Sequence, residues 1–190
     1  MLGIDGSGPH TILLSTLCGQ CPQGATGCCT GPPEYDWSDI GRVVFLGGRD
    51  FLLEGITHGH LTPSARGLVL RRVRGRASPD ARRRLACVHH GPKGCTISPD
   101  RRPATCNYYL CQDAYDEPSA GASVQTCRTT HAQLAGWYRA WDDTIASLIR
   151  ELWPGGPVWD TVFLDWLGDR FRELSAETQP KAGRVGGSGP

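Results

Sequence analysis

Two stretches carry almost all the cysteines of this chain: Cys18–Cys29, C-G-Q-C-P-Q-G-A-T-G-C-C, and Cys87–Cys111, C-V-H-H-G-P-K-G-C-T-I-S-P-D-R-R-P-A-T-C-N-Y-Y-L-C. Together they hold eight of the nine cysteines, and Cys127 lies outside them. Both stretches are rich in Gly and Pro and have no periodic apolar face, so hydrophobic packing does not account for so many thiols. The sulfurs therefore either pair with one another or bind a metal.

The remainder of the sequence favours metal binding over disulfide pairing. A chain of 190 residues is long enough to bury a core without the disulfides that very small secreted domains need. Residues 1–17 contain no basic leader, and no stretch approaches the roughly 18–20 apolar residues of a membrane span. We therefore expect a cytoplasmic protein with no membrane contact, in a reducing compartment where clustered cysteines usually bind metal.

The spacing of the cysteines suggests how they are presented. Cys18 and Cys21 form a C-x2-C turn, whose two sulfurs can meet one tetrahedral centre. Cys28 and Cys29 are adjacent, and because neighbouring side chains tend to diverge, we expect them to serve different centres or one of them to bridge. The C-x4-C spacing that ends at Cys111 suits a short helix or turn with both sulfurs on one side.

Other polar residues lie close to these cysteines in the sequence. Arg101 and Arg102 precede Cys106 and would offset the negative charge of a thiolate cluster. His89 and His90 are candidate ligands, although with eight sulfurs available a hydrogen-bonding or exposed role is favoured for both.

Hydrophobic periodicity predicts a helical scaffold. Short helices are expected over residues 36–46 and 49–57, and a long helix of about eight turns begins between Ser119 and Ser123. Its apolar stripe is formed by residues three and four apart: Val124, Cys127, His131, Leu134, Tyr138, Trp141, Ile145, Leu148 and Leu152. After the break at residues 153–157, a second helix over about 158–174 has its own apolar face: Trp159, Val162, Phe163, Trp166, Leu167, Phe171 and Leu174. Cys127 and His131 are read as core residues of the first stripe rather than as groups that reach the metal.

The predicted fold class is a small, metal-stabilised α+β protein with irregular cysteine-rich loops, a short β-hairpin and a C-terminal αα-hairpin. The expected divisions are a flexible arm over 1–14, a cysteine-cluster metal-binding domain over 15–114, a helical hairpin packed on it over 115–176, and a disordered tail over 177–190. The β-hairpin is expected to pair residues 67–74 with 83–88 across a turn at 75–80.

The hairpin is strongly basic. Eight arginines fall between residues 66 and 84 against the single acid Asp80: Arg66, Arg71, Arg72, Arg74, Arg76, Arg82, Arg83 and Arg84. Such a stretch can meet nucleic acid or an acidic protein partner. A solvated hairpin face is favoured, because the whole chain has a net charge of +1 and no aromatic residues are interleaved to stack on bases.

The order of these motifs resembles the YkgJ-type cysteine-cluster family, a zinc- or iron-chelating CxxCxxCC domain. The resemblance covers about residues 15–112 and rests on C-x2-C-x6-C-C, a helix opened by D-W-S-D-I, and C-x7-C-T-I-S-P-D-R-R-P-A-T-C-x4-C. Six residues separate Cys21 from Cys28, where the family name has two or three. The resemblance implies eight metal ligands: Cys18, Cys21, Cys28, Cys29, Cys87, Cys95, Cys106 and Cys111. The family also contains flagellin lysine methylases, whose relatives are thought to hold an iron–sulfur cluster, and this slightly favours such a cluster over Zn²⁺.

Three functions follow from the sequence. The first is a metal-binding protein whose iron–sulfur or zinc site is structural or supports redox or protein-modification chemistry. The second is a cluster-containing enzyme resembling protein lysine methylases, although no strand with a glycine-rich turn, no G-x-S-x-G and no H-E-x-x-H identifies catalytic residues. The third is a nucleic-acid or protein adaptor that uses the arginine-rich residues 66–84. Eight thiolates accommodate two four-sulfur sites, one cluster with spare thiols, or a bridged group.

Overall fold

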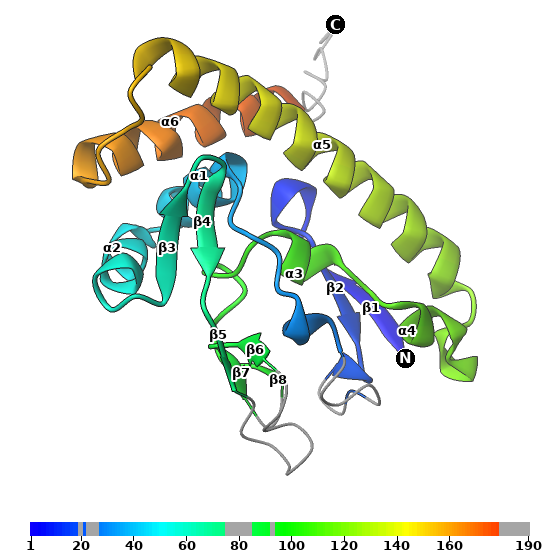
Figure 1. Ribbon diagram of the computed structural model, residues 1–190. Helices are drawn as coiled ribbons and strands as arrows, with labels where there is room; N and C mark the ends of the chain where they lie inside the picture. The colour runs from blue at the N-terminus through cyan, green and yellow to red at the C-terminus, as the bar shows by residue number, and fades with distance from the viewer. Residues whose placement is uncertain (19–20, 22–26, 75–84, 92–93, 179–190) are drawn as a thin grey trace, which may run out of the picture.

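The computed structural model describes residues 1–18, 21, 27–74, 85–91 and 94–178, which form a small α+β protein (Figure 1). The α-helices of these residues are α1 (Trp37–Phe45), α2 (Arg49–Thr57), α3 (Thr105–Tyr108), α4 (Gln112–Asp116), α5 (Ser123–Leu152) and α6 (Thr161–Thr178). Short 3₁₀ turns occur at η1 (Gly8–His10), η4 (Cys28–Thr30) and η6 (Pro118–Ala120). The strands pair as antiparallel hairpins: β1 (Leu2–Asp5) with β2 (Ile12–Ser15), β3 (Leu61–Ser64) with β4 (Gly67–Leu70), β5 (Arg72–Arg74) with β6 (Leu85–Cys87), and β7 (His90–Gly91) with β8 (Gly94–Cys95).

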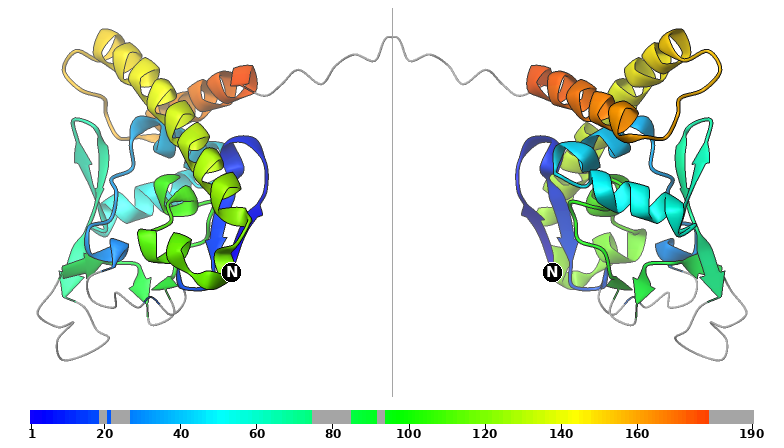
Figure 2. Two further views of the ribbon diagram at one scale, coloured as in Figure 1. Left: turned by 90° about the vertical axis from the view of Figure 1, so that its right-hand side faces the viewer. Right: turned by 90° about the vertical axis from the view of Figure 1, so that its left-hand side faces the viewer.

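The predicted C-terminal helical pair is present. Helix α5 begins at Ser123, within the predicted window, and ends before Pro154, while α6 begins and ends a few residues later than expected. The two helices cross rather than lie along each other (Figures 1 and 2), and α6 packs chiefly against α1, which also contacts α5. The main core therefore forms where these three helices meet, with Ile40, Ile145 and Leu167 among its fully buried residues.

The apolar stripe predicted for α5 is buried at the centre of the helix but not at its C-terminal end. Cys127, Leu134, Tyr138, Trp141 and Ile145 are buried. After that point the buried position is Ile149, and the expected Leu152 is 53% exposed. On α6, Val162 was expected in the core but is 74% exposed, because the face turned toward α1 is centred on residues 163–171.

The N-terminal residues form a hairpin, so the predicted flexible arm over residues 1–14 is wrong. Strands β1 and β2 pair from Leu2↔Ser15 to Asp5↔Ile12, and Leu2 and Leu13 are buried. The hairpin packs against α5 and α3, and Tyr138 donates a hydrogen bond to the Pro9 carbonyl oxygen at 2.7 Å. The strand pairing and the packing on these helices together place residues that the Gly-rich sequence did not identify as a hairpin.

The predicted arginine-rich hairpin is corrected in part. Strand β5 pairs with β6 as expected, but residues 67–70 form β4, which pairs with β3 instead. The predicted turn at 75–80 lies outside the described residues, as does the predicted tail beyond 178, while residues 177 and 178 belong to α6. Gly67 has φ of +129°, and a Cβ there would lie 2.0 Å from the carbonyl oxygen of Tyr35. This contact, beside the Tyr35↔Leu68 bridge, explains why the strand begins at a glycine.

None of the helices in the described residues is long and apolar enough to cross a membrane.

Candidate metal centre

The eight cysteines of the two dense stretches come close enough in the fold to act on one another electrostatically. They are contributed by separate elements: Cys18 follows β2, Cys28 and Cys29 begin η4, Cys87 ends β6, Cys95 ends β8, Cys106 lies in α3 and Cys111 precedes α4, while Cys21 stands between residues that are not described. Turn η4 packs against β6, and a Cβ on Gly94 would lie 3.4 Å from the carbonyl oxygen of Cys18. The fold thus brings together cysteines that are far apart in the sequence.

All nine cysteines are free thiols, but their surroundings differ. Four are exposed, namely Cys18, Cys28, Cys95 and Cys106, and Cys21, Cys29 and Cys111 are half-buried. Cys87 is buried at the base of the group. Cys127 is fully buried in the apolar cluster beneath α5, and desolvation alone raises its pKa, as predicted for a core residue. A metal held by the eight would therefore face the solvent.

The adjacent thiols of Cys28 and Cys29 interact with each other, and the expectation that they serve different centres or that one of them bridges stays a prediction. They are hydrogen-bonded to each other, and this bond is the main cause that lowers the pKa of Cys28 to about 6 and raises the pKa of Cys29. The backbone N–H groups of the same two residues also favour the Cys28 thiolate, while desolvation opposes it. Cys28 is therefore the more acidic thiol of the pair.

Electrostatic repulsion among the other thiols raises several of their pKa values and indicates which of the eight cysteines lie near one another. Desolvation raises the pKa of Cys18, followed by repulsion from Cys28, Cys111 and Cys21. Desolvation also raises the pKa of Cys106 to about 12, and Cys95, Asp39, Cys87 and Cys28 add to it. The pKa of Cys29 is raised by Cys28 first, and repulsion from Cys95 and Cys87 adds to this rise. Cys18, Cys21, Cys28 and Cys111 thus form one interacting set and Cys29, Cys87, Cys95 and Cys106 another, and Cys28 joins the two because it also acts on Cys29 and Cys106.

The donor chemistry fits a thiolate metal site, since four thiolates are the ligand set of both structural zinc and iron–sulfur clusters. The side chains as they stand do not converge: within the described ranges, no group of three or more His, Cys, Asp or Glu is arranged to hold a metal ion. The fit therefore rests on the identity and gathering of the donors. Closing either site requires thiol rotation and adjustment of the loops.

The loop that leads to Cys106 is fixed from below by helix α1. The Asp39 carboxylate accepts a hydrogen bond from the Ala104 N–H at 2.6 Å, and Arg42 donates to the carbonyl oxygens of Pro99 and Arg102. Both side chains are almost fully buried. The D-W-S-D-I passage of the sequence thus supplies Asp39, and the loop residues P-D-R-R-P-A bind to this helix through backbone groups.

The two arginines of this loop have different roles. Desolvation raises the pKa of Cys18, and the positive charge of Arg102 opposes this rise, as predicted for a group that offsets thiolate charge. The Nε of Arg102 donates to the Ile97 carbonyl oxygen at 2.9 Å. Arg101 instead donates to the carbonyl oxygens of Leu46 and Gly47 at 2.8 and 3.1 Å. It therefore binds the turn between α1 and α2.

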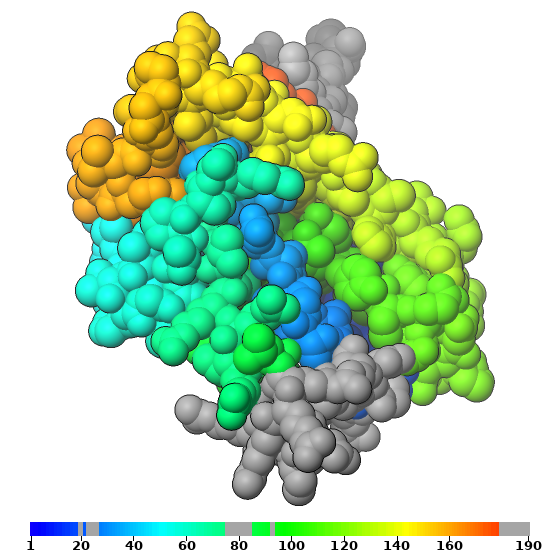
Figure 3. Space-filling view, in the orientation of Figure 1, coloured from blue at the N-terminus to red at the C-terminus, as the bar shows by residue number. Residues whose placement is uncertain are grey.

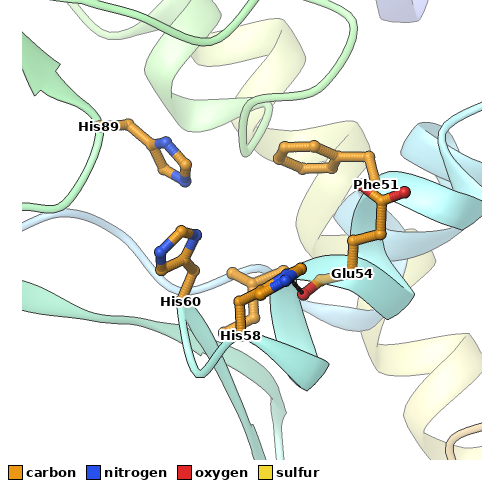
Figure 4. Close-up of a pocket in the computed structure, with 7 residues that line it drawn as sticks. Phe51, Glu54, His58, His60 and His89 are labelled. Atoms are coloured by element: carbon orange, nitrogen blue, oxygen red, sulfur yellow. Dashed lines mark hydrogen bonds between the residues drawn. The ribbon is translucent and has the colours of Figure 1, made fainter.

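The histidines that the sequence made candidates lie in different parts of the protein. His89 faces a pocket lined by His58, His60, Glu54 and Phe51 (Figure 4). His90 lies in β7, opposite Cys95 in the strand register. His131 on α5 is half-buried beside the rings of Tyr108 and Tyr109, with centroids 5.7 and 6.2 Å away. Sequence reasoning missed His58 and His60, although a His-Gly-His triplet at the end of a predicted helix was the signal that could have identified them.

The described arginines of the basic stretch, Arg66, Arg71, Arg72 and Arg74, are exposed. Two of them belong to β5, which pairs with the strand that ends at Cys87. Figure 3 shows this side of the molecule, where residues 61–74 lie next to the segment of residues 27–36. Arg76, Arg82, Arg83 and Arg84 lie outside the described residues.

Comparisons with protein-family models, with curated proteins and with solved structures give no match, so the resemblance to the YkgJ-type family stays a prediction.

Proposed function

We propose that this chain is a metal-binding protein that holds an iron–sulfur cluster or zinc through its eight gathered cysteine thiolates. The observation that carries the proposal is the assembly of free thiols from separate elements of the fold. Buried packing does not account for them, because Cys18, Cys28, Cys95 and Cys106 are exposed.

Electrostatics gives the physical reason for a cation. Each thiolate raises the pKa of its neighbours, so the group cannot ionise fully without compensation. A divalent ion or a cluster reverses this relation, since it stabilises thiolates and releases their protons. The Cys28 thiol, with its lowered pKa, would be the first thiolate available to a metal.

The two sets of four thiols support two four-sulfur centres rather than one cluster with spare thiols. The adjacent pair supplies one sulfur to each centre, so the centres would be neighbours. When bound, zinc would lock the surrounding loops together, whereas an iron–sulfur cluster would also allow electron transfer. The resemblance to the YkgJ-type family slightly favours the iron–sulfur cluster, and the exposed position suits exchange of electrons or metal with a protein partner.

Anaerobic purification followed by iron, zinc and acid-labile sulfide analysis and a visible absorption spectrum tests the proposal. We expect bound metal in the wild type. Cys18→Ser and Cys106→Ser, one from each set, should each lose part of that metal and retain the rest. Cys127→Ala is the matched control, because this thiol is buried elsewhere, and it should retain all of the metal. Reduced, folded protein without metal, or equal metal loss in the control, would contradict the proposal.

A second candidate function is an adaptor for nucleic acid or an acidic protein. Its basis is the exposure of Arg71, Arg72 and Arg74 next to the strand that carries Cys87. Replacing these three arginines with alanine should abolish a strongly salt-dependent binding to DNA or RNA. Absence of any such binding by the wild type at low salt would exclude nucleic acid.

A further inference from the structure

A second group of metal-ligating side chains lines a cavity that has no cysteine in its lining. A cavity of about 210 Å³ opens beside the end of α2 and the start of β3. Three of the six histidines of the chain line it, together with Glu54 and Phe51 (Figure 4). Histidines are rarely gathered by chance on one small cavity, and imidazole nitrogen is the commonest protein ligand for transition metals.

The end of helix α2 positions two of these histidines. The Gly59 N–H donates to the Ile56 carbonyl oxygen at 3.0 Å, and the His60 N–H donates to the Gly55 carbonyl oxygen at 2.8 Å. These bonds form a Schellman motif with Gly59 at φ of +65°. The motif reverses the chain sharply, so His58 on the last turn and His60 on the following segment both border the cavity.

His58 is held in the tautomer that a metal requires. Its Nδ1 lies 2.8 Å from the carbonyl oxygen of Glu54. Because a carbonyl oxygen only accepts, Nδ1 must carry the proton in this bond, which leaves the Nε2 lone pair free on a neutral ring. Metal-binding histidines commonly have one ring nitrogen fixed in this way by a backbone carbonyl.

His89 contributes a nitrogen that has no partner. Its Nε2 is buried and forms no hydrogen bond, which normally costs about 1–3 kcal/mol. The ring faces His60, with centroids 5.9 Å apart and planes at 85°, and Figure 4 shows ring nitrogens of the two turned toward each other. Since metal–nitrogen bonds are about 2.0–2.1 Å, two rings on one ion have centroids about 5–6 Å apart. The separation of His60 and His89 falls within this range, and that of His58 and His60, 6.2 Å, is slightly above it.

We propose that His58, His60 and His89 form a binding site for a divalent transition-metal ion, separate from the thiolates and with nitrogen ligands. The three donors do not yet surround one point, as no such group occurs in the described residues. Glu54 is exposed and His60 and His89 are half-buried, so rotation of these three side chains can complete the coordination while His58 keeps its bond to the Glu54 carbonyl oxygen. Imidazole and carboxylate ligands suit Zn²⁺ or Ni²⁺, and no thiol takes part.

Zinc titration of anaerobically purified full-length protein, with its own metal content measured first, tests this site. Side-chain ¹⁵N NMR of the six histidines reports directly on nitrogen ligation and is independent of the thiols. We expect one additional zinc equivalent to shift the imidazole nitrogens of His58, His60 and His89 and to leave those of His10 and His131 unchanged. Because unloaded thiolates would take up zinc first, the titration is continued until the thiols are saturated, and the imidazole shifts then identify the zinc that nitrogen binds.

Variants provide the second measurement. His60→Gln and His89→Gln should weaken the additional zinc by at least about 10-fold, the lower end of the loss caused by removing even a supporting partner. His90→Gln is the matched control, since it changes the neighbouring histidine outside the cavity lining. Zinc that binds all three variants equally, or that shifts no nitrogen of the cavity histidines in the wild type, would overturn the proposal.

Discussion

The buried charges of helix α1 give a direct test of how the cysteine loop is held. Arg42 is 2% exposed and donates to the carbonyl oxygens of Pro99 and Arg102, while Asp39, 3% exposed, accepts from the Ala104 N–H. Replacing Arg42 with methionine keeps much of the side-chain volume and removes the charge and its donors. The loop that leads to Cys106 then loses its main attachment to α1.

The expected loss of folding stability follows from the polar groups that Arg42→Met leaves without a partner. The Pro99 carbonyl oxygen keeps a bond from Asn107 Nδ2 at 2.7 Å, but the Arg102 carbonyl oxygen loses its bond to Arg42. Desolvation already raises the pKa of Asp39 to about 7, and loss of the Arg42 charge would raise it further. Leaving a buried acceptor without its partner typically costs about 1–3 kcal/mol, and more where a charged group is involved. That is a large part of the roughly 5–15 kcal/mol that stabilises a typical domain.

Urea unfolding, monitored by circular dichroism, measures this cost. Arg49→Met is the matched control, because Arg49 forms an exposed ion pair with Asp165 at 2.9 Å, and such pairs contribute about 0–1 kcal/mol. The double variant Asp39→Asn/Arg42→Met should lose less than the sum of the two single losses, since it leaves no unpaired carboxylate. If Arg42→Met destabilised the protein no more than Arg49→Met, the assigned role of the buried charges would be refuted.

Two further predictions concern the helices. Burial is the first cause that raises the pKa of Asp142, which accepts from the Ser38 N–H at 3.2 Å, to about 6. A raised carboxyl pKa means tighter proton binding in the folded state, so stability is greatest in acid and falls as pH rises from about 4 to about 6. Asp142→Asn should therefore gain about 1 kcal/mol relative to wild type between pH 4 and pH 7.5, less than the full shift implies because solvent screens this partly exposed carboxylate. Thermal unfolding measures the gain, and an unchanged difference would contradict it. Gly41→Ala should cost about 1–3 kcal/mol, because its Cβ would lie 2.6 Å from the Leu167 carbonyl oxygen. Gly136→Ala has open space around it and should stabilise the protein by up to about 1 kcal/mol. Equal effects of the two variants in urea unfolding would refute the close packing of α1 on α6.

The parts of the fold that depend on local sequence could be predicted. Helix α2 has the predicted bounds, and α5 begins within the predicted window, because helix periodicity and the Trp153–Pro157 break are local signals. The same reasoning failed for residues 1–14, where β1 and β2 form by packing on α5 and α3. It also failed for residues 67–70, whose strand partner is β3 rather than the next basic segment. Partner choice depends on contacts distant in sequence, which periodicity does not encode.

The candidate site likewise has features that the sequence predicts and features that only the structure shows. The sequence by itself determined which residues are ligand candidates, because thiols at this density among Gly and Pro have a chemical rather than a packing role. Only the tertiary structure decided which thiols act on one another, that Cys28 is the more acidic thiol of the adjacent pair, and that His89 faces His58 and His60. The physical reason is that ligand identity is a property of each side chain, whereas electrostatic coupling depends on distances that are fixed when α1 anchors the loop of residues 99–104 and η4 packs against β6.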